Sequence, residues 1–261
     1  MKIVLIGSGN MATFLALRLK EAGHTILQII SPHILHAQTL ADQVHADATT
    51  DISQIRSDAE VVILAVPDDT LRQLAQSLKL PNQIVIHTAG SVPASILSGV
   101  SEKYACIWSI YSIQKEKIPA HRNIPMVVSS QEAKTLELAQ TLAKDISDVV
   151  YMLDDAQKSW AHLGAVIANN FSNHLMVVCE QLMQDHHIPF ELFRPIIQDT
   201  VEKLSHRSPK TLQSGPAIRG DEQTINAQIQ MLSDYPMFAR LYEILSRSIQ
   251  EIHHTHPTTR S

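Results

Sequence analysis

The sequence predicts an α/β fold, in which a doubly wound, mostly parallel sheet is followed by an all-helical C-terminal domain. Short apolar runs alternate with helix-period segments as far as residue 153. The first run, Ile3 to Ile6, has no polar alternation, which is typical of a parallel strand buried on both faces. No strand pattern recurs after residue 153. We therefore expect one domain at 1–153 and a second at 154–261.

The composition narrows the class of protein. The 261 residues are 44% hydrophobic and carry a net charge of −5 without a basic block, so nucleic acid and anionic membranes are poor partners. Cys106 and Cys179 lie far apart and form neither a disulfide framework nor metal-ligand spacing, which suits a reducing compartment. The apolar run before Gly7 is too short for a signal peptide, and no run approaches transmembrane length. We expect a cytoplasmic protein without a metal site.

A glycine motif follows the first strand and opens a helix. The first glycine of GxGxxA allows a sharp turn, the second lets a pyrophosphate approach the backbone, and the alanine lets the helix lie close to the strand. Free N–H groups at the helix start would face the anion. A purely structural turn is the alternative, and the position directly after an N-terminal strand disfavours it. The motif predicts a Rossmann-type cofactor site made by Gly7, Ser8, Gly9, Asn10, Met11 and Ala12.

The residue after the second strand, Thr25 to Ile30, bears on the choice of cofactor. An acid there would accept hydrogen bonds from a ribose 2′-hydroxyl, but the residue is Ser31, whose hydroxyl can donate to a 2′-phosphate. This favours NADP over NAD. No arginine follows; His33 and His36 are weak substitutes, or simply surface residues.

Two further strands end at the same edge of the predicted sheet. The run 60–66 stops at Pro67, and Asp68 or Asp69 is expected to cap the next helix. The run 84–87 ends in a turn of small residues. Its last residue, His87, is more simply explained as the end of the strand than as a ligand contact. Open parallel sheets bind ligands at the carboxyl ends of their strands. We therefore expect cofactor contacts from Val66, Pro67, Gly90 and Ser91.

Further strands are expected at 104–108, 126–129 and 149–153, with a helix at 132–143 between the last two. After them the pattern indicates one long helix at 155–187. At 1.5 Å per residue it would be ~50 Å long. Apolar residues surround it almost completely, which predicts a buried helix. One small lobe could hardly cover this surface, so we expect a homodimer through the helical domain.

A narrow polar stripe interrupts that helix. His162, Asn169 and Asn173 fall within about 40° of one another. Buried polar groups need partners, either internal hydrogen bonds in a packed core or a cleft with ligand and water. In a cleft between the domains, His162 would be the best placed proton donor. Lys158, one turn earlier, is expected to be solvated.

The last motif is GPAIRGD, at 215–221, after a predicted helix at 190–204. Asp221 can cap the helix that begins at Glu222, and Gly215 and Gly220 supply turn geometry. Arg219 could present its guanidinium to a carboxylate or phosphate, or pair with an acid of the other domain. The candidate catalytic residues are therefore His162, Asn169, Asn173 and Arg219.

Together with AVPDDTL (65–71), HTAGS (87–91) and HLGAVIANNFSNHL (162–175), this motif resembles a bacterial family of Rossmann-like proteins with a C-terminal domain of unknown function. That family is commonly described as NADP oxidoreductases of the deazaflavin-dependent type. It is similar, more distantly, to pyrroline-5-carboxylate reductase and the hydroxyacid dehydrogenases. The resemblance covers nearly the whole chain and implies a nucleotide lobe and a helical dimerisation lobe, without a particular substrate. The segment 107–114 lacks the proline expected there, so a substrate contact from Ser109 or Tyr111 is not implied.

The function expected is NADP-dependent hydride transfer to or from a small-molecule substrate bound between the two domains, with the protein supplying position and electrostatics. The alternative is a catalytically silent dinucleotide-binding sensor or interaction protein, which would need the glycine turn but no proton donor.

Overall fold

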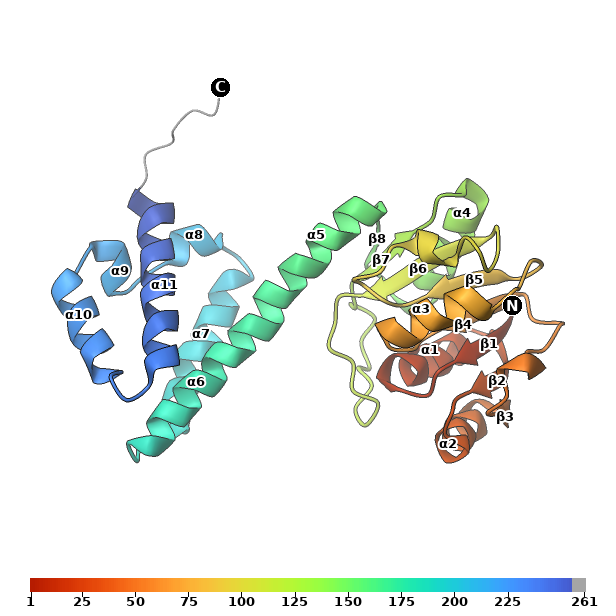
Figure 1. Cartoon of the computed structure of the whole chain (residues 1–261), viewed down its shortest axis with the longest axis horizontal. Helices are drawn as coiled ribbons and strands as arrows, with labels where there is room; N and C mark the ends of the chain where they lie inside the picture. Colours follow the sequence, from red (N-terminus) through yellow and green to blue (C-terminus); the bar gives the residue numbers. More distant parts are fainter. Residues whose placement is uncertain (255–261) are drawn as a thin grey trace, which may run out of the picture. The chain divides into compact units, whose positions relative to one another are not determined.

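The computed structural model describes residues 1–254, and the chain divides into two compact units (Figure 1). The first unit is Met1–Asn170, and the second begins at Phe171. The first half of the long helical region thus belongs to the same compact unit as the sheet.

Among the described residues, the first unit contains an eight-stranded sheet in the order β3-β2-β1-β4-β5-β6-β7-β8. Strands β1 to β6 run parallel, β7 pairs antiparallel with β6, and β8 pairs parallel with β7, which confirms the doubly wound, mostly parallel sheet. The strands are β1 (Lys2–Ile6), β2 (Thr25–Ile30), β3 (Asp47–Thr49), β4 (Val61–Leu64), β5 (Ile84–His87), β6 (Tyr104–Ser109), β7 (Met126–Ser129) and β8 (Val150–Met152). Only β3 was not expected from the sequence.

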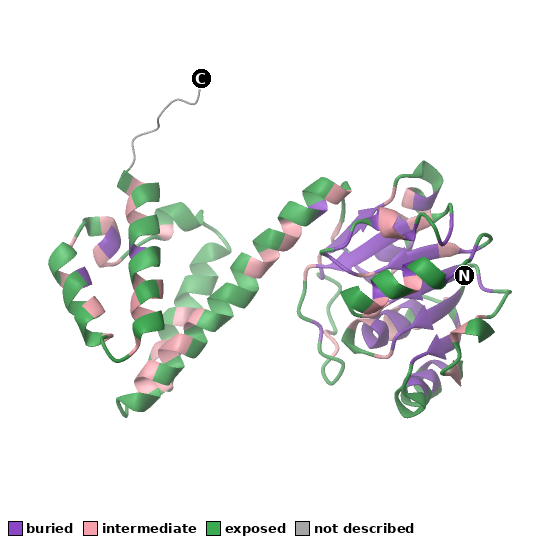
Figure 2. Ribbon diagram, in the orientation of Figure 1, coloured by how far each residue is buried: buried purple, intermediate pink, exposed green. Residues whose placement is uncertain are grey.

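Helices cover both faces of this sheet, and its strands form the buried core (Figure 2). One apolar cluster joins the sheet to α1 (Asn10–Glu21), α2 (Ile34–Val44) and α4 (Ala133–Ile146). A second cluster, on the other face, includes α3 (Asp68–Ser77) and the 3₁₀ turn η2 (Ala94–Leu97). Another 3₁₀ turn, η1 (Ile52–Gln54), connects β3 to β4.

The long helical region differs from the single helix that the sequence predicts. It consists of α5 (Asp155–Ala165), a π-helical turn η3 (Val166–Phe171) and α6 (Ser172–Asp185). A π turn bonds residues five apart and widens the helix, so a 3.6-residue period does not carry through it. The expected burial is also wrong for the single chain, because Leu163, Ile167 and Phe171 are about half exposed.

The described part of the second unit is all-helical, as expected, with the predicted helix at 190–204 divided in two. Its remaining elements are η4 (Phe190–Phe193), α7 (Arg194–Leu204), α8 (Pro209–Leu212), α9 (Pro216–Arg219), α10 (Glu222–Met231) and α11 (Pro236–His254). Asp221 caps α10 by accepting a hydrogen bond from the Thr224 N–H at 3.1 Å, which confirms that prediction. Within residues 1–254, no helix combines the length and the apolar character needed to cross a membrane.

Candidate functional site

The glycine turn has the geometry that an anion site requires. Gly7 has φ +125°, and a side chain there would clash with the Ala65 carbonyl oxygen, so only glycine fits. Gly9 occupies the N-cap of α1, provides no capping side chain, and faces open space. Asn10, Met11 and Ala12 form the first turn of α1. Their end of the helix can therefore direct N–H groups at a pyrophosphate.

Next to this turn, the Ser8 and Ser31 hydroxyl oxygens lie 2.8 Å apart, and Ser31 is buried. A cavity of about 150 Å³ adjoins Ser8 and contains two basic side chains, which come from different parts of the chain. Its lining residues are Ser8, Thr13, His36, Thr39, Leu40, Gln43 and Lys115. The backbone N–H of Lys115 donates to Asn10 Oδ1 at 3.2 Å, which ties this distant segment to the glycine turn. The sequence did not indicate Lys115, because this contact spans 105 residues.

The other expected cofactor residues lie on two turns that are bonded to each other. Val66 and Pro67 follow β4, while Gly90 and Ser91 follow β5. The Ser91 hydroxyl donates to Asp68 Oδ2, which joins the turns. Pro67 occupies the N-cap of α3 and Asp68 is already its first residue, so the expected capping role of Asp68 or Asp69 is wrong.

A larger cavity, of about 610 Å³, opens at the carboxyl end of β6; we call it the substrate cavity. His162 and Asn169 both line it, and the π turn adds Asn170, which the helical period did not predict. The full lining is Trp108, Ser109, Ile110, Tyr111, Ser112, His162, Ala165, Val166, Ala168, Asn169 and Asn170. Ser109 and Tyr111 are thus present although the family's proline is missing. All these residues belong to the first unit.

Two neighbours lie close to the His162 ring. Its ring centroid lies 5.4 Å from that of Trp108. A Cβ added to Gly90 would lie 2.7 Å from His162 Cδ2, so the glycine permits this close approach. The imidazole therefore lies beside an indole ring and beside the backbone of the turn that follows β5.

Two candidate catalytic residues belong to the second unit. Asn173 is exposed on α6, and Arg219 is exposed at the end of α9. Hydrogen bonds from Thr224, and to a smaller extent the charge of Arg219, lower the pKa of the Asp221 carboxyl. Roles for Asn173 and Arg219 in binding or catalysis stay predictions.

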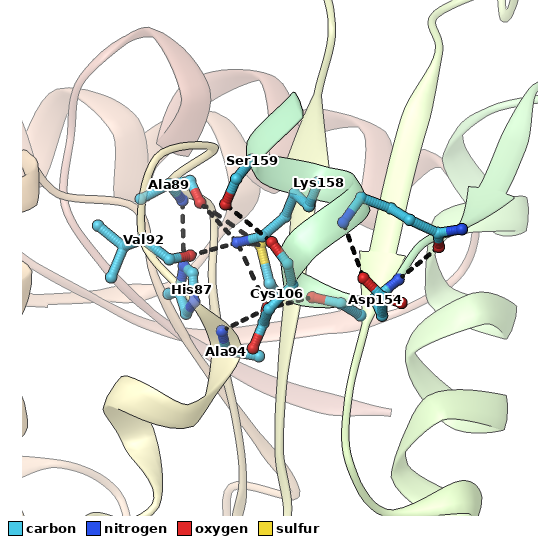
Figure 3. Close-up of polar contacts among 11 residues, drawn as sticks. His87, Ala89, Val92, Ala94, Cys106, Asp154, Lys158 and Ser159 are labelled. Carbon is cyan, nitrogen blue, oxygen red and sulfur yellow. Dashed lines mark hydrogen bonds and ion pairs between the residues drawn. The ribbon is translucent and has the colours of Figure 1, made fainter. Parts of the chain in front are cut away.

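A buried polar cluster adjoins the turn at 88–92 (Figure 3). Lys158 is only 1% exposed, so its expected solvation is wrong. Its ammonium donates to the carbonyls of Ala89 and Val92. His87 is fully buried, and burial, followed by the positive charge of Lys158, lowers its pKa to about 3, so it is neutral. Burial raises the pKa of the neighbouring Cys106 thiol to about 12.

The N-terminal and C-terminal parts of the chain each match a known protein family. Residues 2–91 match a family described as NADP oxidoreductase, coenzyme F420-dependent, and residues 124–249 match a domain of unknown function, DUF2520. A solved structure from Bacteroides fragilis, provisionally designated an NADP oxidoreductase, is 35% identical, covers 96% of this chain and 98% of its own, and has a TM-score of 0.86. An imine reductase from Myxococcus stipitatus, solved with NADP+, shares the fold at 13% identity, 96% and 93% coverage, and TM-score 0.70.

Curated relatives match more locally. A glycerol-3-phosphate dehydrogenase [NAD(P)+] from Thermoanaerobacter is 29% identical over 118 residues, and one from Bacillus licheniformis is 30% identical over 146 residues. These matches cover 39% and 49% of this chain, and the chain spans only 35% and 39% of those relatives' lengths. The full-length match to the Bacteroides fragilis protein, together with the two family models, shows that the chain belongs to the family of NAD(P)-dependent oxidoreductases in which an NADP-oxidoreductase segment precedes the DUF2520 domain.

Proposed function

We propose that this protein catalyses NADP-dependent hydride transfer to or from a small substrate whose reacting group binds in the substrate cavity. One observation carries the proposal: a histidine, His162, faces a cavity at the sheet edge where the glycine turn also lies. Ligands of open parallel sheets bind at this edge. Family membership supports the reaction class.

The residues at the glycine turn fit NADP. Bound NADP would supply or accept the hydride. The N-terminus of α1 would hold the pyrophosphate, with Gly7 and Gly9 giving it access to the backbone. The Ser8 and Ser31 hydroxyls can donate to a 2′-phosphate, and Lys115 places a positive charge in the adjoining cavity. The designation of the Bacteroides fragilis protein and the NADP+ complex of the imine reductase agree with this choice.

The substrate cavity provides the proton and the polar contacts. In reduction, protonated His162 would donate a proton to the developing alkoxide or amine, and in oxidation the neutral ring would accept it. Trp108 and Gly90 both lie close to the ring. The Asn169 and Asn170 amides can donate to and accept from polar groups of the substrate. Asn173 and Arg219 stay candidate substrate residues.

We also propose that the working form is a homodimer joined through the helical domain. Large apolar side chains on α6 and α7 are exposed, among them Val177 at 49%, Ile196 at 63% and Val201 at 62%. Monomeric soluble proteins rarely expose contiguous apolar patches of this kind, and a second copy of the same surface would cover them symmetrically.

The proposal is tested by cofactor binding followed by turnover. Fluorescence titration should give a Kd for NADPH at least about tenfold below that for NADH. Oxidation of NADPH should then be followed by absorbance against aldehydes, ketones, cyclic imines and dihydroxyacetone phosphate. Turnover of one class supports the enzyme. NADPH binding without turnover of any class favours the silent sensor, and the absence of dinucleotide binding contradicts both.

A further inference from the structure

We propose that Lys158 is a positioning residue, which holds the turn at 88–92 where Gly90 meets His162; this rests on the proposed role of His162. The Lys158 side chain is buried, and its ammonium contacts the carbonyl oxygens of Val92 and Ala89, the latter at 3.4 Å. The Cys106 sulfur lies 3.6 Å away (Figure 3). An ammonium has three donors, so these contacts use its full capacity.

The first turn of α5 holds the same segment at a second point. Asp155 Oδ1 accepts hydrogen bonds from the Ala94 N–H at 2.9 Å and from the Ser129 hydroxyl at 3.3 Å. It also lies 3.9 Å from Lys158 Nζ, which partly compensates the buried charge. Lys158 and Asp155 therefore tie the segment 89–94 to α5 at both of its ends.

The held turn directly contacts His162. Residues four apart on a helix share one face, so Lys158 and His162 both face the turn. An added Cβ on Gly90 would lie 2.5 Å from Trp108 Cε2 and 2.7 Å from His162 Cδ2. Because even one added carbon would clash with both rings, a displacement of the turn toward them would change the surroundings of the imidazole.

Lys158 does not line the substrate cavity. Its influence on the reaction would therefore pass through the turn to His162, while the competing explanation is that Lys158 only fills buried space. The two explanations differ in what happens to the environment of His162 when the ammonium is removed from a chain that still folds.

Trp108 fluorescence reports that environment without any cofactor or substrate. The chain has two tryptophans, and the exposed one, Trp160, can be replaced by Phe. Trp108 then remains as the reporter, 5.4 Å from the His162 ring. Because the two rings lie close together, replacing the imidazole changes the surroundings of the indole and therefore its emission. We define the fluorescence step as the difference in Trp108 emission between Trp160→Phe and the same chain carrying His162→Gln as well.

In this background, Lys158→Met should reduce the step by at least about half, and the Kd for NADPH should rise about fivefold because the turn that carries Gly90 and Ser91 is displaced. Lys158→Gln keeps a neutral N–H donor, so its fluorescence step and its Kd for NADPH should lie between those of the parent and those of Lys158→Met. Lys103→Met removes an exposed lysine and serves as the control.

A folded Lys158→Met variant with an unchanged fluorescence step and NADPH affinity would overturn the proposal. If that variant does not fold, the same two measurements are made on Asp155→Ala, which removes the contact that holds the segment at Ala94. Unchanged values would again overturn the proposal. The fluorescence step needs no ligand, so failure of the parent chain to bind NADPH would count against the proposed function and not against the role of Lys158.

Discussion

His162 is the residue on which the proposed chemistry depends most. Replacing it by Ala should lower kcat by about 10²–10⁴-fold, the usual loss for a general acid or base. The Kd for NADPH should change little, because the glycine turn is intact. Steady-state kinetics and fluorescence titration measure the two effects, with His174→Ala, an exposed histidine on α6, as the control. Equal losses of activity and thermal stability would instead make His162 a core residue.

His87 should make stability depend on pH. Its pKa is lowered from the ordinary value of 6.5 to about 3 in the folded chain, mainly by burial. Between these values the unfolded chain binds a proton that the folded chain does not. The free energy of unfolding therefore rises with pH through this window, by up to ~1.4 kcal/mol per pH unit. This contribution is lost on acidification.

His87→Gln removes that contribution while retaining polar atoms. Its Tm, followed by circular dichroism, should fall less than that of the unaltered chain between about pH 6.5 and pH 4.5. The other titratable groups are common to both proteins and cancel in the comparison. Parallel pH profiles would show that His87 is not neutral in the folded state.

Lys115 should set the preference for NADP. Lys115→Gln removes a positive charge beside Ser8, so the Kd for NADPH should rise about tenfold while that for NADH stays nearly constant. Lys117→Gln, two residues further along, is the matched control. Equal changes for both cofactors would place Lys115 away from the 2′-phosphate.

The turn at 88–92, which follows β5, packs against α5. Gly90→Ala would place a Cβ within 2.7 Å of both Trp108 and His162, and such overpacking costs about 1–3 kcal/mol. Tm and kcat should both fall. Gly164→Ala, on α5 with open space around it, should leave kcat unchanged and raise Tm slightly. A Gly90→Ala variant as stable and active as the parent would show that the turn moves freely.

Elements with continuous apolar runs and clear stops were predictable from the sequence, and β2, β5 and β7 begin and end at the expected residues. Strand β3 was missed because its three residues carry no apolar pattern and it depends on pairing with β2. The π turn was missed because nothing local distinguishes a bond to the fifth residue from one to the fourth.

The site was predictable where one segment contains it. The glycine turn could be identified from adjacent residues, and His162 and Asn169 from helical spacing. Lys115 and Lys158 could not, because Lys115 contacts a residue 105 positions away, and Lys158 contacts carbonyl oxygens 66 and 69 positions away. The burial of Lys158 follows from acceptors on a distant turn, which no local pattern reveals.

For the whole molecule, light scattering at micromolar concentration should give twice the 29.0 kDa chain mass. Val177→Glu combined with Ile196→Glu places a charge on each of α6 and α7, which should yield a folded monomer because the charges would be buried between copies. Gln198→Glu, an exposed polar position on α7, should remain dimeric. A monomeric parent chain would contradict the dimer.

If the cofactor and substrate sites form one reaction centre, a crystal structure of the protein grown with NADP+ shows it most directly. The pyrophosphate should lie on the N–H groups of α1, the 2′-phosphate beside Ser31 and Lys115, and the nicotinamide ring should face the substrate cavity next to His162. A nicotinamide ring directed away from His162, or NADP+ bound elsewhere on the chain, would contradict it.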